Sequence, residues 1–173
     1  YGVRMTNKNN PAQWAIKISN ILKTLKETHG IPRVPVNVID ISKEYSKQIC
    51  PSEPITSIEG VEFSNDFDGI LLPKSNNSHH KEWRILYNKT ISCQGRVNFT
   101  LAHEFGHYLL HRDSNPDGLY CNSKDMLTWE SKERQQEQEA NVFASYLLMP
   151  LDDFREQLIN RKEISLEAIY HLS

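Results

Sequence analysis

The chain has 173 residues, enough for one domain with a hydrophobic core, and its formal net charge of −2 argues against a polyanion partner or an anionic membrane surface. No run approaches the ~20 consecutive apolar residues of a membrane span, and the first residues lack the apolar segment of a signal peptide. The cysteines Cys50, Cys93 and Cys121 are widely spaced and odd in number, so we expect no disulfide framework and a reducing cytoplasm.

Two helices are expected in the first 50 residues. The first begins at Asn10-Pro11, because Asn is a favourable N-cap and Pro suits the first helical position. Gly30 ends this helix. A second, shorter helix is expected from Val36 to Gln48, where apolar residues recur at helical spacing.

A small antiparallel sheet is expected next. Residues that favour strands form three short runs, from Ile55 to Phe63, from Gly69 to Leu72 and from Trp83 to Tyr87. Turn-forming residues separate these runs, including a longer loop from Lys74 to Lys81. The middle of the chain therefore predicts three antiparallel strands.

The segment from Phe99 to His111, FTLAHEFGHYLLH, carries the chemistry. His103, Glu104 and His107 form an H-E-x-x-H motif within a helix that is expected to begin near Ser92 to Gly95. Residues four apart share one helix face, with Cβ atoms about 5–6 Å apart, so the two imidazoles can bind one zinc ion. The glutamate beside them can accept a proton from water at the metal.

A catalytic zinc site usually has three protein ligands, and the third has several candidates. Asp113 would complete the longer pattern HExxHxxGxxD, but Leu110 replaces the glycine that allows the chain to turn back. His111 continues the histidine stripe, but three ligands on one straight helix would span about 12 Å of its axis. His111 is therefore interpreted as a helix C-terminal residue, favoured there by the helix dipole.

The helix expected from Ser131 to Met149 offers Glu133, Glu137 and Glu139 as the third ligand. Glu137 is favoured, because it shares a face with small residues that allow close approach to a neighbouring helix. Glu139 lies about 200° away around the helix and is the fallback. Asn141, one turn after Glu137, is expected to orient a metal ligand.

Two further assignments concern the open position of the metal. A tetrahedral intermediate needs an oxyanion stabiliser, for which Tyr87, His111 and Tyr120 are candidates. Cys121 lies in the irregular loop after the motif helix, where its thiolate could block the metal.

The segments GRVNFTLAHEFGHYLLHR (Gly95 to Arg112) and EQEANVFASYLLMP (Glu137 to Pro150) resemble the ImmA/IrrE family of zinc-dependent peptidases. The resemblance includes FDGILLP and WRILYN upstream and extends from about residue 37 to residue 150. It implies an α+β, zincin-like (thermolysin-like) core: a small three-stranded antiparallel sheet, the HExxH helix and a following Glu-bearing helix, flanked by N- and C-terminal helices.

The same resemblance implies Zn²⁺ held by His103, His107 and Glu137, with Glu104 as general base. It also implies that one strand is the edge to which an extended substrate binds, formed by Trp83, Arg84, Ile85, Leu86, Tyr87 and Asn88. We expect residues 1–173 to form a single metallopeptidase domain, with N-terminal helices in 1–50, a catalytic core in 51–150 and the start of a C-terminal helical region in 151–173 that continues further in the family.

The implied function is that of an intracellular, cytoplasmic zinc endopeptidase with a specific protein substrate. Members of the family are associated with cleavage of helix-turn-helix repressors, which controls a stress response or a mobile element. We expect neither direct nucleic-acid binding nor a membrane partner. The alternative is a non-catalytic, zinc-containing regulatory module that binds a repressor or a toxin/antitoxin partner without cleaving it.

Overall fold

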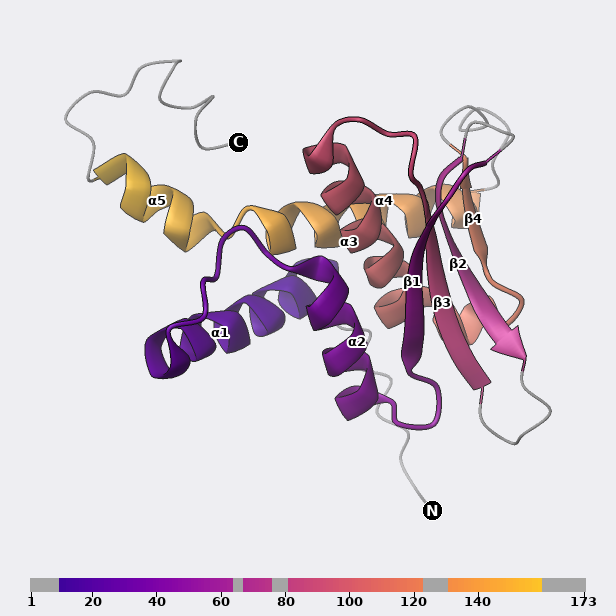
Figure 1. Cartoon of the computed structure of the whole chain (residues 1–173), viewed down its shortest axis with the longest axis horizontal. Coiled ribbons are helices and arrows are strands. Elements are labelled where there is room, and N and C mark those ends of the chain that lie inside the picture. Colours follow the sequence, from indigo (N-terminus) through magenta and orange to yellow (C-terminus); the bar gives the residue numbers. More distant parts are fainter. Residues whose placement is uncertain (1–9, 64–66, 76–80, 123–130, 160–173) are drawn as a thin grey trace.

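The computed structural model describes residues 10–63, 67–75, 81–122 and 131–159 (Figure 1). The elements in chain order are α1 (Pro11–His29), α2 (Val38–Ile49), β1 (Ile55–Val61), β2 (Phe67–Ser75), β3 (Lys81–Asn88), α3 (Gln94–His111), a short 3₁₀ helix η1 (Arg112–Ser114), β4 (Leu119–Asn122), α4 (Ser131–Leu148) and α5 (Leu151–Ile159). The fold class is α+β, as predicted.

The capping residues set the limits of the first two helices. The side chain of Asn10 accepts a hydrogen bond from the backbone N–H of Ala12 at 2.9 Å, and Gly30 ends α1 in the left-handed conformation with φ of 68°. Both limits of α1 are confirmed. Helix α2 begins at Val38 rather than Val36, because the side chain of Asn37 caps it by accepting from the N–H of Asp40.

The sheet is mixed and has four strands in the order β1-β3-β2-β4. The three expected strands are present, but the prediction of a purely antiparallel, three-stranded sheet was wrong. Strand β3 lies between β1 and β2, so β1 and β3 run parallel, while β2 pairs antiparallel with both β3 and β4. The sequence shows where strands occur, whereas their order depends on packing between distant segments.

Strand β3 lies inside the sheet, so the prediction that it is the edge to which an extended substrate binds was wrong. Its backbone pairs with β1 on one side and with β2 on the other, so it cannot accept an added strand. All six residues of the predicted edge therefore belong to an interior strand: Trp83, Arg84, Ile85, Leu86, Tyr87 and Asn88. Among the described strands, β1 and β4 are the outer ones.

The helices form layers on one face of the sheet (Figure 1). Helix α3 packs against β2 and β3 on one side and against α4 on the other, and α1 packs against α4. Aromatic rings fill these contacts: Trp83 of β3 meets Tyr108 of α3 with ring centroids 6.3 Å apart, and Phe105 of α3 meets Phe143 of α4 at 5.6 Å. All four side chains are fully buried, so α3 is the centre of the core.

Gly106 allows α3 and α4 to approach closely. A Cβ atom at this position would lie 2.9 Å from Cδ1 of Phe143 and 3.3 Å from the Cα atom of Ala140. We therefore expect Gly106→Ala to lower the free energy of unfolding by about 1–3 kcal/mol through overpacking. That cost exceeds the ~0.5–1 kcal/mol that alanine gains over glycine in a helix. Denaturant unfolding measures the difference.

Gly95→Ala is the matched control on the same helix, because the nearest atom to its added Cβ is Sγ of Cys93 at 3.8 Å. We expect this variant to be neutral or slightly stabilised. Equal effects of the two substitutions would contradict the tight contact between α3 and α4.

Helix α5 follows Pro150, and Asp153 on α5 accepts a hydrogen bond from the buried Arg33 at 3.1 Å. Residues 160–173 of the predicted C-terminal helical region lie outside the described residues. Within the described part of the chain, no helix combines the length and the apolar composition that crossing a membrane requires.

Candidate metal centre

Helix α3 directs His103 and His107 towards α4. The two residues lie one turn apart, and both are buried in the interface between the helices. Their Nε2 atoms are 2.9 Å apart. The buried, largely apolar surroundings of α3 fix this orientation, because Leu101, Phe105 and Tyr108 occupy the core.

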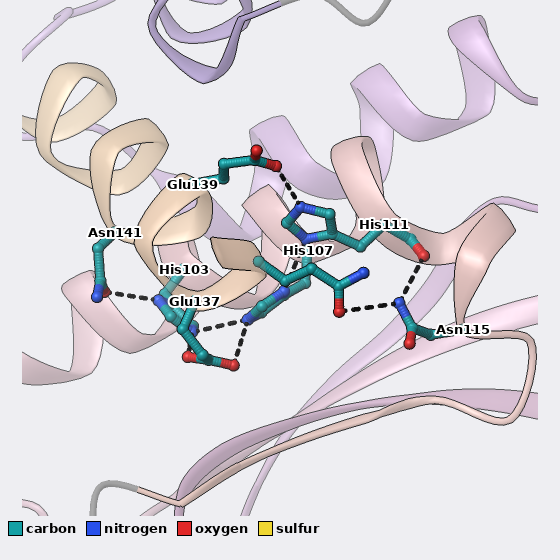
Figure 2. Close-up of polar contacts among 8 residues, drawn as sticks. His103, His107, His111, Asn115, Glu137, Glu139 and Asn141 are labelled. Carbon is teal, nitrogen blue, oxygen red and sulfur yellow. Dashed lines mark hydrogen bonds and ion pairs between the residues drawn. The ribbon is translucent and has the colours of Figure 1, made fainter. Parts of the chain in front are cut away.

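Glu137 on α4 completes a triangle with the two histidines (Figure 2). Its Oε2 atom lies 3.0 Å from Nε2 of His103, and its Oε1 atom lies 3.1 Å from Nε2 of His107. Glu139, the fallback candidate, contacts His111 instead. The structure therefore brings together the three residues that the sequence favours.

The triangle fits a metal ion. Tetrahedral zinc with bonds of about 2.0–2.1 Å separates its ligand atoms by about 3.3 Å, so the observed triangle needs to widen by only a few tenths of an ångström. Two imidazoles and one carboxylate are also a donor set that catalytic zinc uses, leaving a position for water or substrate. The group formed by His103, His107 and Glu137 could hold a metal ion.

The charges of these residues suit a bound cation. Burial would raise the pKa of Glu137, but its hydrogen bonds with His103 and His107 outweigh burial and hold that pKa well below its usual range. Burial lowers the pKa of His107 to about 4, so this imidazole is neutral at neutral pH. Burial also disfavours charged His103, yet Glu137 and Glu104 raise its pKa. A metal ion would supply the positive charge that this proton otherwise provides.

Each imidazole has a partner on the side away from the triangle. Nδ1 of His103 lies 2.9 Å from Oδ1 of Asn141, the asparagine that is predicted to orient a metal ligand. Nδ1 of His107 lies 3.0 Å from Nδ1 of His111, and Nε2 of His111 lies 2.9 Å from Oε2 of Glu139 (Figure 2). Sequence reasoning missed the second of these arrangements, although the regular spacing of His103, His107 and His111 was a signal for it.

Glu104 lies on the side of α3 that faces β2. Its side chain is fully buried, and a Cβ atom at Gly69 of β2 would lie 2.8 Å from its Oε1 atom. The same Cβ would lie 2.6 Å from Cγ2 of Thr100. Strand β2 therefore passes close to the carboxylate, in space that only a glycine leaves open.

We expect Gly69→Ala to lower the free energy of unfolding by about 1–3 kcal/mol, because the new methyl group overlaps Thr100 and Glu104. Adding Thr100→Ser removes the Cγ2 atom and should restore part of the loss. Denaturant unfolding of the single and double variants measures both effects. A Gly69→Ala protein as stable as the wild type would show that β2 does not constrain the carboxylate.

The other sequence candidates lie away from the triangle or outside the described side chains. Asp113 belongs to η1 and is exposed, with an ion-pair contact to Arg112 at 3.7 Å, and Glu133 is exposed at the start of α4. Tyr87 lies at the end of β3, where it pairs with Gly60 and Gly69 across the sheet. The backbone of Tyr120 and Cys121 belongs to β4, but their side chains lie outside the described part of the structure.

One comparison with known proteins matches. The family model of the IrrE N-terminal-like domain, peptidase family M78, matches residues 63–171, more than half of the chain. The matched part includes both α3 and α4 and therefore the whole triangle. A search of curated proteins gives no match.

Proposed function

Because the chain belongs to the IrrE N-terminal-like family of M78 peptidases, we propose that it is a zinc-dependent endopeptidase with a zincin-like (thermolysin-like) core. The observation that carries the proposal is the buried triangle of His103, His107 and Glu137. A fully buried acid, Glu104, follows directly after the first of these ligands. We assign zinc rather than another metal because this donor set is one that catalytic zinc uses.

The residues of the site would have separate roles in peptide hydrolysis. His103, His107 and Glu137 would hold zinc, which when bound polarises a carbonyl group and lowers the pKa of water. Glu104 accepts the proton of the attacking water and delivers it to the leaving amine. Asn141 holds His103 in the orientation that presents Nε2 to the metal.

We place the extended substrate along β4 rather than β3. Strand β4 is an outer strand and pairs with β2, whose Gly69 approaches Glu104. A peptide that adds to β4 by backbone hydrogen bonds would pass on the side of the sheet nearest to the general base. Phe99, partly exposed with its ring 6.5 Å from that of His103, is available to an apolar substrate side chain.

The substrate is a specific protein in the cytoplasm, and we infer a helix-turn-helix repressor. The resemblance of residues 95–112 and 137–150 to ImmA/IrrE proteins supports this class of partner. The near-neutral charge balance agrees with a protein partner rather than direct binding to nucleic acid.

The test is co-expression with candidate helix-turn-helix repressors, followed by intact mass measurement of each candidate partner. We expect two fragments whose masses sum to the partner plus one water, and no fragments when a chelator is present. A stable complex with an uncleaved partner, unchanged by chelator, would instead support a regulatory module that binds without cleavage.

A further inference from the structure

We propose that His111 and Glu139 form a positioning relay behind the metal ligand His107, in which the charge of Glu139 acts on the metal site through His111. The inference rests on the proposed metal site, because it concerns the orientation of one of the ligands. It assigns Glu139 a role different from that of a ligand and gives His111 a role beyond ending the helix.

The relay is a continuous chain of contacts. Nδ1 of His107 lies 3.0 Å from Nδ1 of His111, and Nε2 of His111 lies 2.9 Å from Oε2 of Glu139. The other oxygen of Glu139, Oε1, accepts a hydrogen bond from Nε2 of Gln135 at 2.8 Å. Both oxygens of the carboxylate are therefore held, and its orientation towards His111 is fixed.

Metal binding determines where the protons lie along this chain. When Nε2 of His107 faces a metal ion, its proton resides on Nδ1 and is donated to Nδ1 of His111. Nδ1 of His111 then has no proton, so the proton of His111 resides on Nε2 and is donated to the Glu139 carboxylate. With a neutral His111 and an ionised Glu139, only one arrangement of protons satisfies both contacts, and it leaves the Nε2 lone pair of His107 directed at the metal.

Burial makes the relay costly to break. His107 is fully buried and the side chain of His111 is 5% exposed, so water cannot readily replace a lost partner. The carboxylate at the end is 30% exposed, where its charge is less costly to maintain. The relay thus extends the carboxylate–histidine–metal arrangement by one imidazole.

The imidazole of His111 is not needed to complete the end of α3. Nδ2 of Asn115 donates to the backbone carbonyl of His111 at 3.0 Å, and Nη1 of Arg112 donates to that of Tyr108 at 3.0 Å. Side chains outside the relay therefore satisfy these carbonyls, while the imidazole is directed towards α4 (Figure 2).

The test measures zinc affinity by chelator competition and the visible spectrum of the Co²⁺-loaded full-length protein. We expect His111→Leu to weaken zinc binding by about 10–100-fold and to change the Co²⁺ bands, because His107 loses its orienting partner. The amide of His111→Gln can accept a hydrogen bond from His107 and donate one to Glu139. The zinc affinity and Co²⁺ spectrum of this variant should therefore lie closer to those of the wild type. Glu139→Gln should weaken binding less than His111→Leu.

The double variant His111→Leu/Glu139→Gln distinguishes a relay from two separate structural effects. Because Glu139 acts through His111, the double variant should bind zinc about as weakly as His111→Leu alone. His29→Leu and Glu44→Gln, at exposed positions, are the matched controls.

Three results would overturn the relay: affinities and Co²⁺ spectra equal to those of the controls, full additivity of the two substitutions, or no rescue by His111→Gln. If His111→Leu does not fold, the comparison of Glu139→Gln with Glu44→Gln replaces it, and equal zinc affinities of these two variants would overturn the relay. Failure of the wild type to bind either metal would refute the metal site itself, whereas wild-type binding with unaffected variants refutes only the relay.

Discussion

Replacing Glu104 with glutamine is expected to abolish cleavage of the partner protein while leaving zinc bound. Glutamine preserves the shape of the side chain but cannot accept a proton from water. General bases contribute about 10²–10⁴-fold to rate, so the cleavage rate should fall by at least about 100-fold. Timed digestion followed by intact mass gives the rate, and elemental analysis gives the zinc content.

Glu44→Gln is the matched control, because Glu44 is an exposed acid whose side chain is 65% accessible on α2. This variant should cleave like the wild type. A Glu104→Gln protein that keeps its zinc and cleaves at the wild-type rate would refute the assigned general base. Loss of both zinc and cleavage would mean that Glu104 supports the site rather than the proton transfer.

Replacing Glu137 with glutamine is expected to have the second-largest effect, on metal binding itself. In the proposed site this carboxylate would be an anionic ligand, and it contacts the two imidazoles at 3.0 Å and 3.1 Å. Its loss should weaken zinc binding by more than the roughly 10–100-fold typical of residues that only orient a ligand. Chelator competition measures the affinity, and cleavage should be lost in parallel.

Glu133→Gln on the same helix is the matched control, since Glu133 is exposed near the start of α4. The zinc affinity of the Glu139→Gln variant should lie between those of the Glu133→Gln and Glu137→Gln variants. Equal zinc affinities for the Glu137 and Glu133 variants would mean that the metal has a different third ligand. If Glu139→Gln lost more zinc affinity than Glu137→Gln, Glu139 would be the third ligand and Glu137 the residue that acts from outside the metal site.

Local sequence signals predicted most of the helices, and they favoured the three residues that the structure brings together. The Asn10-Pro11 start and the Gly30 end of α1 depend on hydrogen bonds and backbone angles within a few residues. The spacing of His103 and His107 depends only on helix geometry. Glu137 could be favoured over Glu139 because the two residues occupy different faces of one helix, and the structure places only Glu137 against both histidines.

Local sequence signals could not predict contacts between strands and helices that lie far apart in the sequence. The position of β3 between β1 and β2 follows from packing against α3, and the short strand β4 lies in a segment whose irregular composition indicated a loop. Both errors affected the same conclusion, because the strand expected to bind substrate is interior, and β4, which was not predicted, is one of the two outer strands among those described. The contact between His111 and Glu139 likewise depends on how α4 lies across α3.

Anomalous diffraction at the zinc absorption edge tests the metal centre most directly. We expect one anomalous peak per chain, about 2 Å from Nε2 of His103, from Nε2 of His107 and from a carboxylate oxygen of Glu137. The Glu137→Gln protein should lose the peak or show it at much lower occupancy. Absence of a peak in the wild-type crystal, or a peak between His111 and Glu139 instead, would contradict the proposed centre.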